Sequence, residues 1–403
     1  MAEFSVTKLG AKNDKKIFYL VLDGVGGIPF PGVGKTALAA AKKPNIDALL
    51  PQATCGLFDP VEPGITPGSG PGHLGLFGYD PRQYQIGRGV LSALGVDFEL
   101  GPDDVAARFN FCSLAQDRKI TDRRAGRIST ETNERLIKML NEQVHLAGDA
   151  ELFLKTVSEH RGLFVLRGKG LAGRVADTDP QKIGALPLDP VADDEPSQPT
   201  ARLALDFINQ AEKILAGEEK ANGVLLRGFD KMPDMPMMHE MFPISCGAVA
   251  TYPMYRGVAR LVGMKVLPPP ADLKETFAMA AANRDNYDYL FIHVKYTDKA
   301  GEDGNFELKV QVIEEVDALM PILTAARPDV LVITGDHSTP AALKQHSWHP
   351  VPGLLYAPET ARPDNLRTFD EDHCRCGGFG RLPLRILMQL ALAHAMKLNK
   401  FGA

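Results

Sequence analysis

The sequence predicts an α/β fold, in which a domain with a largely parallel sheet carries a smaller inserted α/β domain. Short, continuously apolar runs alternate with segments of helical periodicity, which is typical of parallel sheets with helical crossovers. Aspartates directly follow several of these runs, where the strands of such a sheet end and ligands bind. The length of 403 residues exceeds one ordinary hydrophobic core and favours two domains.

The first domain is predicted to begin with a buried strand at Ile17–Leu22, an unbroken apolar run rich in β-branched and aromatic residues. A short helix is expected over residues 37–50, with a break at Pro44. Residues 66–75 read Thr-Pro-Gly-Ser-Gly-Pro-Gly-His-Leu-Gly, which indicates a glycine-rich turn that leads into a helix. Ser69 would lie at the helix start, where unpaired N–H groups and the positive end of the dipole favour an anion. A plain turn with a capping serine is the alternative interpretation.

The chain is expected to leave this domain at Gly87-Arg88-Gly89. We therefore predict that residues 1–86 and 256–403 form one discontinuous domain and that residues 87–255 form the insertion. Alternating or apolar runs indicate strands, and amphipathic spacing indicates helices. The predicted elements of the insertion are strands at 105–114, 163–166 and 223–226, helices at 130–146 and 201–216, and a loop at 185–199 rich in proline and aspartate.

The last third repeats the pattern of an apolar strand followed by polar side chains. Strands are predicted at Tyr289–Val294 and Val330–Thr334, because both runs are continuously apolar apart from one internal histidine and a terminal threonine. The expected helices cover residues 271–284, 305–326 and 382–398, and a further short strand covers residues 354–356.

The polar residues that follow these strands form the candidate site. Asp23, Asp298 and the pair Asp336-His337 are expected to converge, because the carboxyl ends of parallel strands meet at one edge of a sheet. His346 lies in a proline-containing loop before the last short strand and can join them. Carboxylates and imidazoles in this mixture suit Mn²⁺, Zn²⁺ or Mg²⁺, and there are enough for two ions. The remaining histidines are expected to be ordinary core or surface residues, and these include His73 and His293.

The composition argues against several classes of binding partner and cellular location. The net charge of −5 gives no electrostatic reason for binding nucleic acid or an anionic membrane. No apolar run approaches the roughly 20 residues of a membrane span. The five cysteines are odd in number and scattered, which favours a reducing compartment over a disulfide framework. A cytoplasmic protein is therefore expected, and we further expect it to be a monomer or a small homo-oligomer.

Taken together, these segments resemble the alkaline-phosphatase superfamily and, within it, the archaeal-type branch of cofactor-independent phosphoglycerate mutase. The resemblance runs through nearly the whole chain in order. It implies a three-layer, alkaline-phosphatase-like domain with an inserted substrate-binding domain. The matching segments are residues 22–24, 34–36, 44–47, 66–75, 78–81, 87–89, 122–127, 174 with 177–180, 227–228, 293–295 with 298 and 301, 335–340, and 346–347 with 350–352.

The resemblance implies that Ser69 is a nucleophile that forms phosphoserine. The implied ligands are Asp23, Ser69, Asp336 and His337 for one metal ion, and Asp298, Glu302 and His346 for the other. The ions are expected to be Mn²⁺, with Mg²⁺ or Zn²⁺ as alternatives, and no 2,3-bisphosphoglycerate is required.

Two positions depart from the family. Glu302 stands where a histidine is usual, and a carboxylate there would favour harder cations. Gly27 stands where an acidic residue is usual.

The implied reaction interconverts 3-phosphoglycerate and 2-phosphoglycerate, an isomerase step of glycolysis and gluconeogenesis. Arginines of the inserted domain are expected to hold the substrate and exclude water, and closure of the two domains is expected because these arginines and the metal ligands lie on different domains. Asp122 is a candidate proton carrier, whereas Arg118 and Arg123 are expected to be ordinary surface charges. The implied substrate-binding residues are Asp122, Arg124, Arg127, Arg174, Arg227 and Lys295.

Two other functions remain open at this point. A phosphatase or phosphonate hydrolase on the same scaffold would use the same metals and phosphoserine but pass the phosphoryl group to water. A non-catalytic, metabolite-binding homologue is the second alternative, and the exchange at Glu302 is the feature that favours it.

Overall fold

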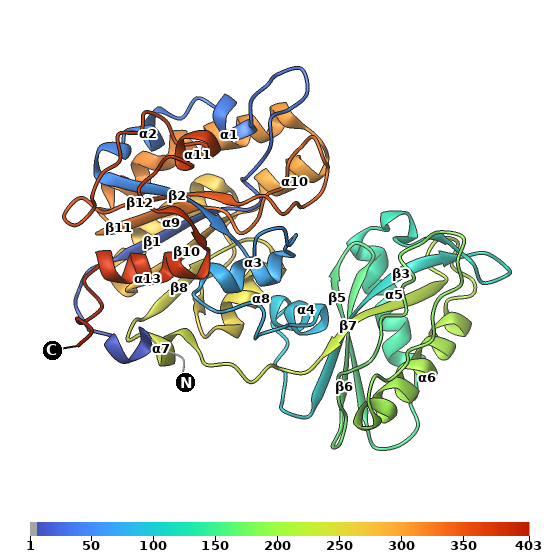
Figure 1. Cartoon of the computed structure of the whole chain (residues 1–403). Helices are drawn as coiled ribbons and strands as arrows, with labels where there is room; N and C mark the ends of the chain where they lie inside the picture. The colour runs from blue at the N-terminus through green and yellow to red at the C-terminus, as the bar shows by residue number, and fades with distance from the viewer. Residues whose placement is uncertain (1–5, 403) are drawn as a thin grey trace. The chain divides into compact units, whose positions relative to one another are not determined.

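The computed structural model describes residues 6–402, and the chain divides into two compact units (Figure 1). Unit 1 contains the chain up to Gln85 and from Met235 onward, and unit 2 contains Ile86–Asp234. The second joint thus differs from the expected one. Residues 235–255 belong to unit 1, because the strand β8 (Cys246–Val249) pairs in parallel with β10 (Tyr289–Val294) of that unit.

Unit 1 is built on an eight-stranded sheet with the order β13-β2-β12-β11-β1-β10-β8-β9. Every neighbouring pair is parallel except those of β12, which runs antiparallel to β11 and β2. The prediction of a largely parallel sheet is therefore confirmed. The strands are β1 (Ile17–Leu22), β2 (Ala53–Asp59), β8, β9 (Lys265–Val266), β10, β11 (Val330–Thr334), β12 (Val351–Tyr356) and β13 (Gly380–Pro383).

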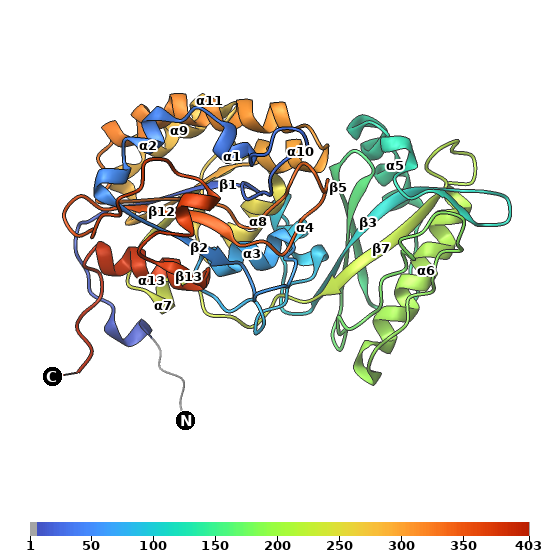
Figure 2. The same ribbon diagram turned by 45° about the horizontal axis from the view of Figure 1, so that its top comes forward.

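Helices cover both faces of this sheet and complete three layers. Figure 2 shows α1, α2, α9, α10 and α11 on one side, and α3, α8 and α13 on the other. The helices of unit 1 are α1 (Ala37–Ala40), α2 (Pro44–Asp47), α3 (Ser69–Leu76), α7 (Met238–Met241), α8 (Pro253–Leu261), α9 (Leu273–Ala282), α10 (Tyr296–Glu302), α11 (Phe306–Ala325), α12 (Glu371–Cys374) and α13 (Arg385–His394).

The central strands of unit 1 have the bounds that the sequence predicts. All residues of β1, β10 and β11 are buried, because helices cover both faces of the sheet, and a continuous apolar run is what such strands require. The break expected at Pro44 is also confirmed. Pro44 begins α2, where its missing N–H costs no hydrogen bond.

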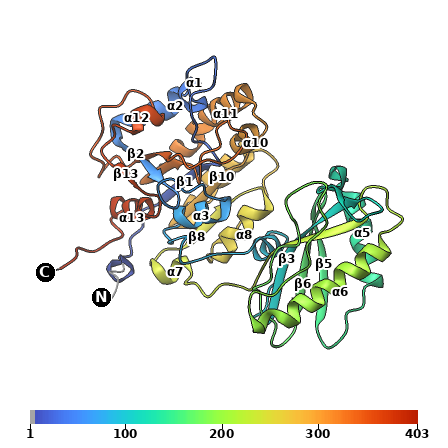
Figure 3. The same ribbon diagram turned by 45° about the vertical axis from the view of Figure 1, so that its right-hand side comes forward.

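Unit 2 has a separate core and an antiparallel sheet, in which β3 pairs with β4, β6 and β7. Figure 3 shows α5 and α6 along one face of this sheet, where they pack on Val105, Ala107 and Phe109. Gly89 of α4 comes so near β3 that a Cβ there would lie 2.2 Å from the backbone oxygen of Ala106. The elements are β3 (Asp104–Leu114), β4 (Ile120–Asp122), β5 (Glu151–Ser158), β6 (Arg161–Arg167), β7 (Gly223–Asp230), α4 (Arg88–Gly95), α5 (Thr130–Gln143) and α6 (Gln198–Ile214).

Within the part of the chain that the structure describes, no helix has both the length and the apolar character to cross a bilayer.

Candidate active site

Asp23 lies directly after β1, at the edge where the parallel strands end. The backbone N–H of Asp23 continues the strand ladder by donating to the Val294 oxygen at 2.9 Å. Its carboxylate is fully buried, and neither oxygen has a hydrogen-bond partner among the described residues. Burial alone would raise the pKa of Asp23, but Lys295 and His293 hold that pKa well below its ordinary value.

Asp336 and His337 follow β11 and meet Asp23, as the strand pattern predicts. His337 Nε2 lies 3.3 Å from Asp23 Oδ1 and 3.1 Å from Asp336 Oδ2, and all three side chains are buried. Asp336 Oδ1 accepts a hydrogen bond from the Gly24 N–H at 3.1 Å. These three side chains have ligand atoms close enough together to hold one metal ion.

Ser69 begins α3 and faces this group. Its Oγ lies 3.3 Å from His337 Nε2. α3 can pack this closely against the loop after β11 because Gly72 has no side chain. A Cβ at Gly72 would lie 2.3 Å from the backbone oxygen of Asp336. Gly68 is the N-cap residue and makes no side-chain bond, so Ser69 is the first helical residue and does not itself cap the helix.

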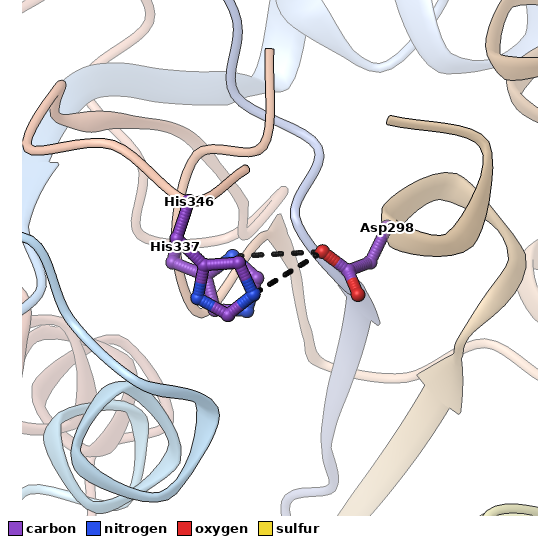
Figure 4. Close-up of side chains that lie close together, drawn as sticks. All are labelled: Asp298, His337 and His346. Carbon is purple, nitrogen blue, oxygen red and sulfur yellow. Dashed lines mark ion pairs between the residues drawn. The ribbon is translucent and has the colours of Figure 1, made fainter. Parts of the chain in front are cut away.

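A second group of possible ligands consists of Asp298, His337 and His346 (Figure 4). Asp298 lies in α10, and His346 lies in the loop before β12, with its Nε2 3.6 Å from Asp298 Oδ1. The rings of His337 and His346 stack with their centroids 3.7 Å apart. Thr339 donates its hydroxyl to Asp298 Oδ1 at 2.5 Å.

The chemistry of these side chains fits divalent cations. Buried carboxylates are costly unless positive charge compensates them, and two of them, Asp23 and Asp336, lie side by side here with few well-formed hydrogen bonds. Lys295 and the neighbouring imidazoles supply part of that charge, and a bound cation would supply the rest. Oxygen and imidazole ligands together suit Mn²⁺ and related ions.

Lys295, predicted to bind substrate, lies among these carboxylates. Its Nζ is 3.1 Å from Asp23 Oδ2 and 2.5 Å from Asp298 Oδ2. Burial lowers the pKa of Lys295, but the charges of the two aspartates outweigh this effect and raise it. The ammonium therefore stays protonated and partly neutralises both predicted metal ligands.

Glu302 lies at the end of α10 and more than half of its side chain is exposed. Its Oε1 is 4.0 Å from His346 Nε2, and it belongs to neither of the two groups of ligand atoms. Burial and the charge of Asp298 raise the pKa of Glu302. The structure thus brings Glu302 near the second group without placing it in contact.

Two histidines that the sequence suggested were ordinary core residues also touch the site. Both are buried, with His73 Nδ1 3.2 Å from Asp336 Oδ2 and His293 Nε2 3.5 Å from Asp23 Oδ2. The local signal for His73 is its place one helical turn after Ser69. The signal for His293 is its place near the end of β10, beside Val21 of β1.

The remaining predicted substrate residues belong to unit 2. Asp122 accepts the backbone N–H groups of Arg124 and Gly126 at 2.8 and 2.7 Å, which fixes the turn that carries Arg124 and Arg127. Both arginine side chains are exposed. Burial, together with four arginines that include Arg124 and Arg127, lowers the pKa of His160 to about 3, so these two arginines share one positively charged region.

The other arginines differ in how they are held. Arg227 is buried, and its guanidinium lies 3.4 Å from the carboxylates of both Asp177 and Asp179. Arg174 is exposed, with its guanidinium 3.8 Å from Asp194. Arg123, expected to be an ordinary surface charge, instead binds the buried Asp179 through two bonds of 2.8 and 2.7 Å. The expectation for Arg123 was wrong, because Asp179 is a long-range partner that local sequence does not reveal.

Known proteins resemble this chain in sequence along its whole length. A sequence model described as 2,3-bisphosphoglycerate-independent phosphoglycerate mutase matches residues 51–221. The chain is 50% identical over 404 residues to a Thermus thermophilus protein named "Probable 2,3-bisphosphoglycerate-independent phosphoglycerate mutase", with 99% of each chain covered. A Thermotoga neapolitana protein of the same name is 47% identical over 398 residues, with 99% of this chain and 98% of that protein covered.

Two solved structures resemble the whole chain. A cofactor-independent phosphoglycerate mutase from Thermoplasma acidophilum aligns with a TM-score of 0.71 and 28% identity, over 94% of this chain and all of the other. A protein from Pyrococcus horikoshii aligns with a TM-score of 0.83 and 29% identity, over 97% of this chain and all of the other.

Proposed function

The chain belongs to the family of 2,3-bisphosphoglycerate-independent phosphoglycerate mutases, and we propose that it interconverts 3-phosphoglycerate and 2-phosphoglycerate with two divalent metal ions. The observation that carries this proposal is the place of Ser69. Its hydroxyl lies 3.3 Å from His337, which in turn contacts the buried carboxylates of Asp23 and Asp336. A nucleophile beside buried anionic ligands is the arrangement that a phosphoserine mechanism needs.

The residues divide between two metal positions. We assign Asp23, Ser69, Asp336 and His337 to one ion, and Asp298, Glu302 and His346 to the other. Mn²⁺ is the proposed ion, because the set contains four carboxylates and two imidazoles and no thiolate. When bound, such ions lower the pKa of a coordinated hydroxyl and neutralise charge on a phosphate.

Ser69 carries the phosphoryl group between the two positions of glycerate. Its Oγ attacks phosphorus, the Oγ–P bond forms, and the bond from phosphorus to the 3-oxygen breaks. The glycerate then reorients, its 2-oxygen attacks phosphorus, and the Oγ–P bond breaks. Over the two transfers the 3-oxygen gains a proton and the 2-hydroxyl loses one, so the reaction is proton-neutral. The positive N-terminal end of α3 supports this role, since it favours the anionic phosphoserine.

Unit 2 would supply the groups that hold the triply charged substrate. We propose that Arg124, Arg127, Arg174 and Arg227 bind its phosphate and carboxylate, with Lys295 of unit 1 contributing a further charge. Asp122 is the proposed proton carrier. These residues must also exclude water, because hydrolysis of phosphoserine would make the enzyme a phosphatase.

A coupled assay with enolase tests the reaction. The metal-free protein, reconstituted with Mn²⁺, should convert 3-phosphoglycerate to 2-phosphoglycerate with little release of inorganic phosphate. Ser69→Ala should lose at least ~10³-fold in kcat, because it removes the nucleophile. Full activity of Ser69→Ala would refute the phosphoserine step. Steady phosphate release without 2-phosphoglycerate would instead identify the phosphatase alternative, and failure to bind metal would favour the non-catalytic one.

We further propose that the enzyme acts in the cytoplasm, where glycolytic intermediates are found.

A further inference from the structure

Lys309 is a buried lysine in the first turn of α11 that neither the sequence pattern nor the proposed reaction explains. The residue is 1% exposed, and lysine is almost never buried to this degree without partners. Its ammonium donates three hydrogen bonds, all to backbone oxygens, at 2.7 Å to Gly24, 3.3 Å to Gly26 and 2.8 Å to Thr339. A tetrahedral ammonium with three donors is suited to three acceptors in this arrangement.

These three oxygens belong to the two loops that carry three of the predicted metal ligands, Asp23, Asp336 and His337. The first loop follows Asp23, and the second runs from Asp336 to Thr339. The loops also bind each other, since the Thr339 N–H donates to the Gly24 and Gly26 oxygens at 3.2 and 3.1 Å. Lys309 therefore binds the junction of the two loops, which consists of Gly24, Gly26 and Thr339 and their hydrogen bonds to one another.

Groups at this junction donate hydrogen bonds to the carboxylates of two predicted metal ligands. The Gly24 N–H donates to Asp336 Oδ1, and the Thr339 hydroxyl donates to Asp298 Oδ1. The packing is tight, because a Cβ on Gly24 would lie 2.4 Å from Thr339 Oγ1 and 2.8 Å from Asp298 Oδ1. A shift of either loop would therefore move the carboxylates of Asp298 and Asp336 relative to each other.

We infer that Lys309 is a positioning residue for both metal sites, which holds the loops after Asp23 and Asp336 at the spacing that their ligand atoms require. This inference rests on the proposed metal sites but adds a residue that lies outside their ligand set. Burial lowers the pKa of Lys309 to about 8, while Glu371, Asp298 and Asp23 raise it, so the ammonium remains largely charged at neutral pH.

An alternative role for Lys309 is purely electrostatic, and the two roles predict opposite results. A positive charge near a cation site repels the cation, so removal of the charge alone would strengthen metal binding. Loss of a positioning residue would weaken metal binding, because the ligands would no longer be held in the required geometry. The sign of the change in Mn²⁺ affinity therefore distinguishes positioning from simple charge.

The experiment compares Lys309→Met, Lys309→Gln and a matched control. Lys397→Met removes another lysine of unit 1 that is 1% exposed, whose Nζ binds the Asn13 oxygen at 2.8 Å and Asp288 at 3.3 Å. Metal-free proteins are titrated with Mn²⁺ by calorimetry, and their unfolding temperatures are measured with and without Mn²⁺.

We expect Lys309→Met to weaken Mn²⁺ binding at least tenfold and to reduce the rise in unfolding temperature on adding Mn²⁺. Lys309→Gln should be intermediate, because its amide can still donate hydrogen bonds, and Lys397→Met should bind Mn²⁺ like the wild type. Unchanged or stronger binding by both Lys309 variants would overturn the inference. If Lys309→Met does not fold, Lys309→Gln decides. If the wild type itself binds no Mn²⁺, the proposed metal sites fail, which is a separate outcome.

Discussion

Asp336 Oδ2 lies 3.2 Å from His73 Nδ1, and neither side chain is exposed to solvent. The same ring nitrogen lies 2.9 Å from the backbone oxygen of Ser69. Because both neighbours are acceptors, Nδ1 must carry the hydrogen. His73 thus joins the start of α3 to a predicted metal ligand, and so fixes the proposed nucleophile relative to that ligand.

Replacement of His73 should affect stability and catalysis together. His73→Ala removes a donor to a buried carboxylate, which we expect to cost about 3 kcal/mol of unfolding free energy in the metal-free protein. We expect kcat to fall much more than KM rises, since the arginines proposed to bind the substrate are untouched. His73→Asn can place an amide nitrogen near the former Nδ1 and should restore part of kcat. Urea unfolding and steady-state kinetics measure both effects, and equal kcat for the two variants would show that the Nδ1 donor is not important.

Glu371 predicts a pH dependence of stability. Its Oε1 is buried and has no hydrogen-bond partner within the described chain, and burial raises the pKa of this carboxyl from 4.5 to about 7. Between those pH values the folded protein retains a proton that the unfolded chain releases. This group therefore makes the folded state less stable as pH rises, by about 3 kcal/mol once the pH exceeds 7.

Glu371→Gln removes this titration and keeps an oxygen to accept the hydrogen bond from Thr36. The variant should be up to about 3 kcal/mol more stable than the wild type at pH 8 and nearly equal to it at pH 4.5. Unfolding in urea at the two pH values checks this. Glu315→Gln, an exposed change on α11, should alter stability equally at both pH values. A Glu371→Gln variant with no gain at pH 8 would contradict the prediction.

Metal preference should depend on Glu302. Its Oε1 is 4.0 Å from His346 Nε2, so a small movement of the side chain would bring it to the second proposed metal position. Glu302→Gln should weaken the second Mn²⁺ equivalent about tenfold or more, whereas Glu302→His should retain two ions and shift preference toward Zn²⁺. Calorimetry with each metal measures these changes. Asp303→Asn is the control, and weakening by that change alone would identify Asp303 as the ligand.

The sequence predicts the central strands of the larger sheet, which are completely buried, because nearly every residue of such a strand is apolar. The runs at Ile17–Leu22, Tyr289–Val294 and Val330–Thr334 are apolar because both faces of their strands are covered, and their bounds are confirmed. The strands that are not predicted from the sequence are β2, β4, β5, β8, β9 and β13. In β2 and β8 the reason is that Gly56 and Gly247 interrupt short runs of mostly small residues. Those glycines are required by close neighbours, such as Phe379 near Gly56, which the local sequence does not reveal.

The candidate site could be predicted to the extent that its residues follow strands. Asp23, Asp336 and His337 meet as the rule for parallel sheets requires. Lys309 gave no signal, because its acceptors lie up to 285 positions away and are backbone atoms of no particular residue type. A backbone oxygen can belong to any residue type, so the sequence does not show which residues accept hydrogen bonds from a buried lysine. Positioning residues of this kind are found only in the three-dimensional structure.

Substitutions at two adjacent arginines of unit 2 should have different effects, one on substrate binding and the other on the free energy of unfolding. Arg124 is exposed, so Arg124→Ala should change the unfolding free energy by less than about 0.5 kcal/mol and should raise KM for 3-phosphoglycerate about tenfold if it binds the substrate. Arg123 makes two bonds to Asp179, whose side chain is 0% exposed, so Arg123→Ala should cost about 2 kcal/mol. The destabilisation by Arg123→Ala is limited because Arg227, 3.4 Å from Asp179, still offers a positive charge to this buried carboxylate. Kinetics and thermal unfolding of both variants test the division, and an unchanged KM in Arg124→Ala would remove Arg124 from the proposed substrate site.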